Sequence, residues 1–128
     1  MTPAQIEEAR RWTRLKGWRW MPGMAGMLEA DGYRVLAVTD SGEVLMDGWG
    51  YTAATIPDVT DPATRGCLLA LAREITGSHV HVVFADEDLY RCICRMRGDD
   101  GRWTAYSSSG PTETAALLVA CERHEVTP

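Results

Sequence analysis

The chain of 128 residues has the length of one ordinary domain, and 45% of its residues are hydrophobic, which is enough for a buried core. Its formal net charge of -5 argues against a protein that holds duplex nucleic acid by bulk charge, because such proteins are generally basic. No window approaches the ~18 to 20 apolar residues of a membrane-spanning helix, so the sequence predicts neither export nor membrane insertion. We expect a single domain over residues 1–128.

An amphipathic helix is predicted at residues 3–15. Ile6, Ala9 and Trp12 recur at a spacing of three residues, which places them on one side of a helix, and the arginines lie toward the other side. Thr2 is the expected N-cap. The turn that follows, residues 17–23, is rich in aromatic side chains, and we expect it to hold the helix against the rest of the chain.

Two sets of three strands are predicted, and each set should form an antiparallel meander. The first set lies near residues 25–29, 33–39 and 43–47, and a connecting loop follows at 48–60. The second set lies near residues 79–84, 89–97 and 102–107, with turns at 86–88 and 99–101. The predicted fold class is therefore α+β, with an antiparallel sheet and helices packed on one face.

Two further helices are predicted, one in the centre of the chain and one near its end. The central helix spans residues 61–76, with Asp61 as the cap and Pro62 at the first helical position, where its missing N–H costs nothing. Its middle is apolar around most of the circumference, which is typical of a buried helix. The last helix is expected at residues 111–123 and should begin at Pro111.

Three patches of the chain, residues 18–24, 61–74 and 111–113, carry a resemblance to known proteins. They read Trp-Arg-Trp-Met-Pro-Gly-Met, Asp-Pro-Ala-Thr-Arg-Gly-Cys-Leu-Leu-Ala-Leu-Ala-Arg-Glu and Pro-Thr-Glu. In these patches the chain resembles a group of small phage- and prophage-encoded accessory proteins. In size and layout it is also similar to phage anti-defence sponges such as the Thoeris anti-defence family, which sequester cyclic nucleotide or cyclic ADP-ribose immune signals. The resemblance implies a protein of the cytoplasm of an infected or lysogenic bacterium, and it carries over no site residue.

Four cysteines fall inside predicted helices or strands, at positions 67, 92, 94 and 121. This pattern favours small buried thiols over a disulfide framework, and reduced thiols are typical of the cytosol. We expect no cofactor.

The pairing register of the hairpin formed by residues 79–97 decides which side chains share a face. If Phe84 pairs with Leu89, the two histidines at positions 79 and 81 face Cys92 and Cys94, which is a donor set that zinc favours. If Ala85 pairs with Leu89, the histidines share a face with the arginines instead. The second register is favoured because it gives one nearly pure apolar face, and we therefore predict no metal site.

The favoured register predicts a cationic face that binds a small anionic ligand. Arginine forks suit phosphate oxygens and aromatic rings can stack a base, so the chemistry is that of a nucleotide-binding surface. The alternative is that these side chains only solvate an exposed sheet. The candidate ligand-binding residues are Arg91, Arg95, Arg97, His79, His81, Tyr106, Trp49 and Tyr51.

No catalytic residue is predicted, because the sequence contains no nucleophile elbow, phosphate-binding loop or metalloprotease motif. The leading hypothesis is a homo-oligomeric binding protein that sequesters a nucleotide-derived immune signal of the cyclic nucleotide or cyclic ADP-ribose type. The second is an inhibitor of a host defence protein whose acidic surface mimics nucleic acid. An enzyme ranks third, and turnover of a bound ligand would distinguish it from a sponge.

Overall fold

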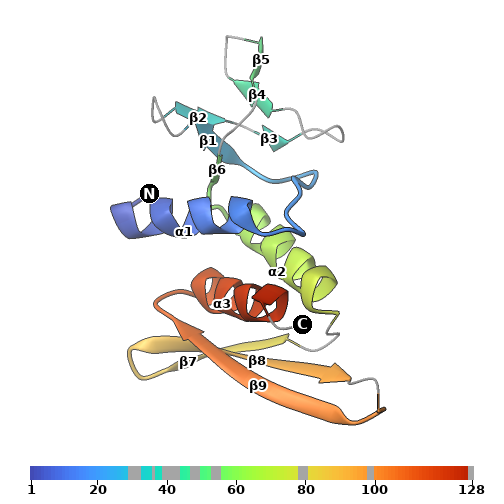
Figure 1. Ribbon diagram of the computed structural model, residues 1–128. Coiled ribbons are helices and arrows are strands. Elements are labelled where there is room, and N and C mark those ends of the chain that lie inside the picture. The colour runs from blue at the N-terminus through green and yellow to red at the C-terminus, as the bar shows by residue number, and fades with distance from the viewer. Residues whose placement is uncertain are drawn as a thin grey trace. The chain divides into compact units, whose positions relative to one another are not determined.

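The computed structural model describes residues 1–28, 33–35, 37–38, 44–46, 50–52, 56–77, 81–97 and 100–126 (Figure 1). The chain divides into two compact units, residues 1–67 and 68–128, which are described one at a time below. That the two units form one domain stays a prediction. The predicted α+β class with antiparallel sheets is confirmed.

The first unit begins with helix α1 (Pro3–Arg14), as predicted. Thr2 caps it through a capping box, in which the Thr2 hydroxyl accepts the Gln5 N–H and the Gln5 side chain accepts the Thr2 N–H. Ala9 and Trp12 are fully buried, and α1 packs against the short strand β6 (Ile56–Pro57). The apolar side of α1 is therefore used inside the unit.

The strands of the first unit form two small antiparallel sheets, so the prediction of a single three-stranded meander is wrong. One sheet has the order β2-β1-β6, with β1 at Gly26–Leu28 and β2 at Tyr33–Val35. The other has the order β3-β4-β5, with bounds Ala37–Val38, Val44–Met46 and Gly50–Thr52. The segment predicted as one strand at 33–39 thus contributes to both sheets, and the predicted loop at 48–60 contains two strands. Position 29, predicted to end the first strand, lies outside the described residues.

Helix α2 (Pro62–Thr76) begins as the sequence predicts and runs through the boundary between the units. Asp61 Oδ2 accepts both the N–H of Thr64, at 2.9 Å, and its hydroxyl, at 2.9 Å. The buried Thr64 hydroxyl in turn accepts the N–H of Ala25 at 2.8 Å, which ties the start of α2 to the chain beside β1. A buried donor is thereby satisfied by the same residue that completes the helix cap.

The second unit is a three-stranded antiparallel meander with one helix on it, as predicted for this half. The strands β7 (His81–Asp86), β8 (Leu89–Arg97) and β9 (Trp103–Gly110) are neighbours in that order. Helix α3 (Glu113–Val126) lies over one face of this sheet (Figure 1). The helix begins two residues later than predicted, because Gly110 still pairs with Tyr90 in the sheet and the Thr112 hydroxyl is the group that accepts the Ala115 N–H.

Small side chains let α3 approach the sheet closely. On the sheet, Cys92, Cys94 and Ser108 face the helix, and the Ser108 hydroxyl donates to the carbonyl of Ala116 at 2.8 Å. A Cβ added to Gly110 would lie 2.8 Å from the Cβ of Ala115, a distance that real side chains do not reach. The interface therefore accommodates thiols, hydroxyls and hydrogens where larger residues would force the two layers apart.

The observed register of the β7–β8 hairpin differs from both predicted alternatives. Asp86 pairs with Leu89, Phe84 with Arg91 and His81 with Cys94, around a two-residue turn at Glu87 and Asp88. The favoured pairing of Ala85 with Leu89 is wrong by one residue, and such a slip moves every side chain of β7 to the opposite face. The slip puts Ala85 in the place expected for Phe84 on the face toward α3, where the helix closely approaches Gly110, and it leaves Phe84 on the other face.

Candidate ligand-binding face

The face of the sheet away from α3, called the open face below, carries cations and apolar groups together. Side chains alternate along a strand, so Leu89, Arg91, Ile93 and Arg95 of β8 share this face. The register adds Phe84 from β7 and, from β9, Ser107 and Ser109. Arg91, Arg95 and both serines are exposed, and Phe84 and Leu89 keep 39% and 46% of their surface in solvent.

The open face presents groups that suit a phosphate. Ser109 pairs with Arg91 and Ser107 pairs with Ile93, so two serines of β9 lie next to the part of β8 that carries Arg91 and Arg95. Arginine binds phosphate oxygens through paired N–H donors, and hydroxyls add further donors. Phe84, directly opposite Arg91, supplies an exposed aromatic ring. The arrangement can bind an anionic group and an apolar or aromatic group side by side.

The opposite face contains the thiols. Cys92, Cys94 and Cys121 form no disulfide and are fully buried, in agreement with the prediction of small buried thiols, whereas Cys67 is half-buried. Burial raises the pKa of Cys92 to about 11 and the pKa of Cys121 to about 12. Such thiols are almost fully protonated at neutral pH and behave as apolar core. Among the described residues, no three His, Cys, Asp or Glu side chains are grouped to hold a metal ion.

The structure brings some of the predicted ligand-binding residues together and separates others. Arg91 and Arg95 share the open face as predicted, and the backbone register places position 97 on the same side. The backbone of His81 pairs with Cys94 and not with an arginine, and its place in the predicted site stays a prediction. Position 106 likewise pairs with Cys94, from the other neighbouring strand.

The remaining candidates lie outside the described residues or in the other unit. Residues 49 and 79 lie outside the described part of the chain. The backbone of Tyr51 lies in β5, paired with Leu45, and so belongs to the first unit. The predicted pairing of an arginine face with an aromatic loop at 49–51 thus stays a prediction.

No protein-family model, curated protein or solved structure matches this chain. The resemblance to phage-encoded accessory proteins and anti-defence sponges therefore stays a prediction. In the described part of the chain, every helix is too short or too polar to cross a bilayer.

Some residues that complete the open face were not predicted from the sequence. Phe84 was expected on the apolar face of the sheet, and Ser109 lies beyond residue 107, the predicted end of the last strand. A signal for the correct register was present, because a two-residue loop is the commonest hairpin connection. Glu87 occupies the first position of that loop with φ of 54°, the left-handed conformation that tight hairpin turns require.

Proposed function

We propose that this chain is a phage-type accessory protein that binds and sequesters a small phosphorylated ligand on the open face of its second unit. The ligand class is nucleotide-derived, of the cyclic nucleotide or cyclic ADP-ribose type, and the protein works in the bacterial cytoplasm as a homo-oligomer. The observation that carries the proposal is that Arg91 and Arg95 are exposed on one face, with Phe84 directly opposite Arg91.

The chemistry of the open face supports this choice over plain solvation of a sheet. Solvating faces consist of charged and polar side chains, whereas this face exposes Phe84 and Leu89, two large apolar groups that gain by being covered. A nucleotide offers both a phosphate for the guanidinium groups and a flat base for the phenyl ring. Capture of such a ligand needs no nucleophile or general base, in keeping with the prediction of a non-enzymatic protein.

Isothermal titration calorimetry against cyclic mononucleotides, cyclic dinucleotides and cyclic ADP-ribose isomers tests the proposal. Arg91→Gln and Arg95→Gln should each weaken binding by about 10-fold or more, because each removes a charge-assisted contact to phosphate. Arg73→Gln, an exposed arginine of α2 in the same unit, is the matched control and should bind as the wild type does. No heat with any compound, or equal affinity in all three variants, would end the proposal.

A second candidate function rests on the same exposed apolar pair. Exposed apolar side chains such as Phe84 and Leu89 are also typical of a protein–protein interface, through which the chain would block a host defence factor. Affinity purification from a host lysate separates the two functions. A stoichiometric protein partner lost on Phe84→Ser favours the inhibitor, whereas a nucleotide recovered unchanged after heat denaturation favours the sponge and argues against an enzyme.

A further inference from the structure

The N-terminal segment of the first unit has a charge opposite to that of the rest of the chain. Residues 1–20 contain five basic and two acidic side chains, a net charge of +3, whereas the remaining residues contain eight basic and sixteen acidic ones, a net charge of -8. The basic residues are those at positions 10, 11, 14, 16 and 19. An acidic protein thus concentrates its cations in the last turns of α1 and in the loop that follows it.

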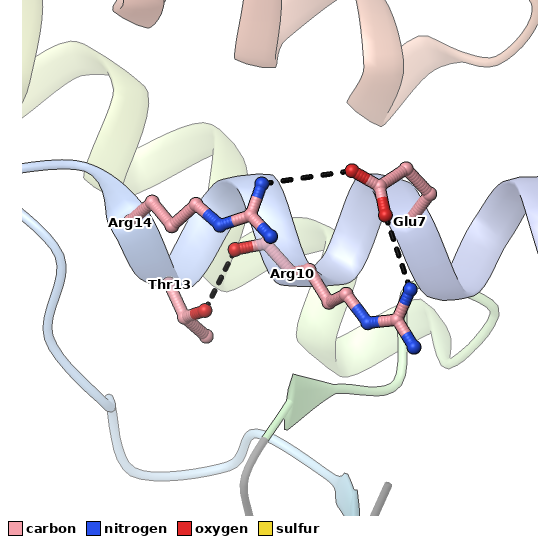
Figure 2. A network of polar contacts seen from close by, with 4 residues as sticks. All are labelled: Glu7, Arg10, Thr13 and Arg14. Atoms are coloured by element: carbon pink, nitrogen blue, oxygen red, sulfur yellow. Dashed lines mark hydrogen bonds and ion pairs between the residues drawn. The ribbon is translucent and has the colours of Figure 1, made fainter.

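The two acidic residues of this segment are already engaged within α1. Glu7 accepts from Arg10 at 3.1 Å and lies 3.6 Å from Arg14, and Figure 2 shows both guanidinium groups turned toward this one carboxylate. Glu8 is buried and accepts the indole N–H of Trp12 at 3.2 Å. Two arginines therefore share one surface carboxylate, and Lys16 and Arg19 are exposed in the loop that follows.

Next to these cations lies a pair of tryptophans. The rings of Trp18 and Trp20 meet edge to face, with centroids 5.3 Å apart and planes inclined by 77°. Both side chains are only half-buried, and the exposed Arg19 stands between them in sequence. In an edge-to-face pair the edge of one ring contacts one face of the other ring. The contact between the two tryptophans therefore covers only one of their four ring faces.

The loop that carries the tryptophans is held at both ends. The backbone N–H of Trp18 donates to the carbonyl of Leu15, at the end of α1. At the far end Met24 is fully buried, its N–H donates to the carbonyl of Met21, and Cys67 of α2 donates to the carbonyl of Pro22. The rings are thus placed before any ligand arrives, which lowers the entropy cost of binding.

We infer that residues 10–20 form a binding surface for single-stranded nucleic acid, separate from the open face of the second unit. Arginine and lysine side chains contact the phosphates, and Trp18 and Trp20 stack unpaired bases. A duplex fits less well, since its bases are already stacked on one another. A membrane surface fits less well too, because Ala9 and Trp12, the apolar side of α1, are buried inside the unit.

Fluorescence anisotropy of a labelled oligothymidylate of about 15 nucleotides, a length that spans one typical site, tests the inference with the full chain. We expect a dissociation constant between about 1 and 100 µM at physiological salt. Replacing Arg14 and Arg19 together by Gln should weaken binding by about 10-fold or more and should lower the slope of log K against log salt by about 1.4, or 0.7 per lost phosphate contact. Arg65→Gln, an exposed arginine of the same unit, is the matched control and should leave both values unchanged.

Two more variants distinguish a binding role from a structural one. Glu7→Gln removes the carboxylate shared by Arg10 and Arg14, so it should tighten binding by about 2- to 5-fold while removing two surface ion pairs of little value to stability. Trp18→Ala should weaken binding by about 5- to 150-fold, which corresponds to the loss of one stacked base, without changing the salt slope.

The inference fails if no oligothymidylate binds, if Glu7→Gln weakens binding, or if a duplex of the same length binds more tightly than the single strand. It also fails if an acidic host protein, and no nucleic acid, is retained by the wild type and lost with the Arg14 and Arg19 variant. Oligonucleotide binding that depends on Arg91 and Arg95 instead would overturn this inference and leave the proposed function standing, so the two can fail independently.

Discussion

Raising the pH should destabilise the protein through the buried thiols of its second unit. Burial raises the pKa of Cys92 from an ordinary 9.0 to about 11, and the pKa of Cys121 to about 12. A thiol of this kind ionises more readily in the unfolded chain than in the folded one. Its contribution to stability is therefore fully present below about pH 9 and is lost as the pH rises toward the folded pKa.

The size of the effect follows from these pKa values. At pH 10 the thiol of an unfolded chain is about nine-tenths ionised, whereas a folded thiol with a pKa of about 11 is about one-tenth ionised. The difference lowers the free energy of unfolding by about 1.4 kcal/mol relative to pH 7, and Cys121 contributes a similar amount. The two thiols together should lower the free energy of unfolding by about 2 to 3 kcal/mol at pH 10 relative to pH 7, which is a sizeable share of the stability of a small protein.

Urea unfolding followed by circular dichroism at pH 7, 9 and 10, under a phosphine reductant, measures this loss. Cys92→Ala and Cys121→Ala should be less stable than the wild type at pH 7, because each leaves a small cavity, but each should lose about 1.4 kcal/mol less between pH 7 and 10. Cys67→Ala, at the half-buried cysteine, should change the pH dependence less. If both core variants lose as much stability as the wild type, the reasoning is refuted, and a gain in stability with pH would instead indicate thiolates held by a metal.

Three further substitutions test the packing and the start of α2. Gly66→Ala should raise the free energy of unfolding by about 0.5 to 1 kcal/mol, since an added Cβ meets nothing within 4 Å and alanine is the better helix former. Gly110→Ala should lower the free energy of unfolding by about 1 to 3 kcal/mol, because the new Cβ would lie 2.8 Å from the Cβ of Ala115. Thermal unfolding compares the two glycine variants, and melting temperatures that shift in the same direction would contradict this description of the packing. Thr64→Val should lower the free energy of unfolding by about 1 to 3 kcal/mol, because it removes the hydroxyl that accepts the buried N–H of Ala25 at 2.8 Å. An unchanged midpoint of urea unfolding would show that this hydrogen bond does not stabilise the protein.

The helices were predictable because their signals are local. Thr2 and Asp61 cap α1 and α2 where the sequence indicates, since a cap acts on amide groups within three residues of itself. The start of α3 was misplaced because its true limit is the pairing of Gly110 with Tyr90, across the sheet. The strands of the first unit were misassigned for a similar reason, as the segment at 33–39 contributes to two sheets.

The candidate site was only partly predictable. The two arginines at positions 91 and 95 share a face in every register, because they lie on one strand four residues apart. Their neighbours depend on the register of β7, and the expectation of a pure apolar face put Phe84 in the core and His81 beside the arginines. That expectation placed the large apolar side chain of Phe84 on the covered face of the sheet. In the structure α3 instead covers the small residues Cys92, Cys94 and Ser108.

The amino-acid sequence by itself determined the helices, their caps, the antiparallel meander of the second unit and the spacing of its arginines, because these depend on groups a few residues apart. Only the tertiary structure decided which face of that meander is covered. Cys92, Cys94, Ser108 and Gly110 are small enough for α3 to approach, so the helix takes their side. Phe84 is thereby left exposed opposite Arg91, and this juxtaposition, which no local pattern contains, completes the surface to which we assign a ligand.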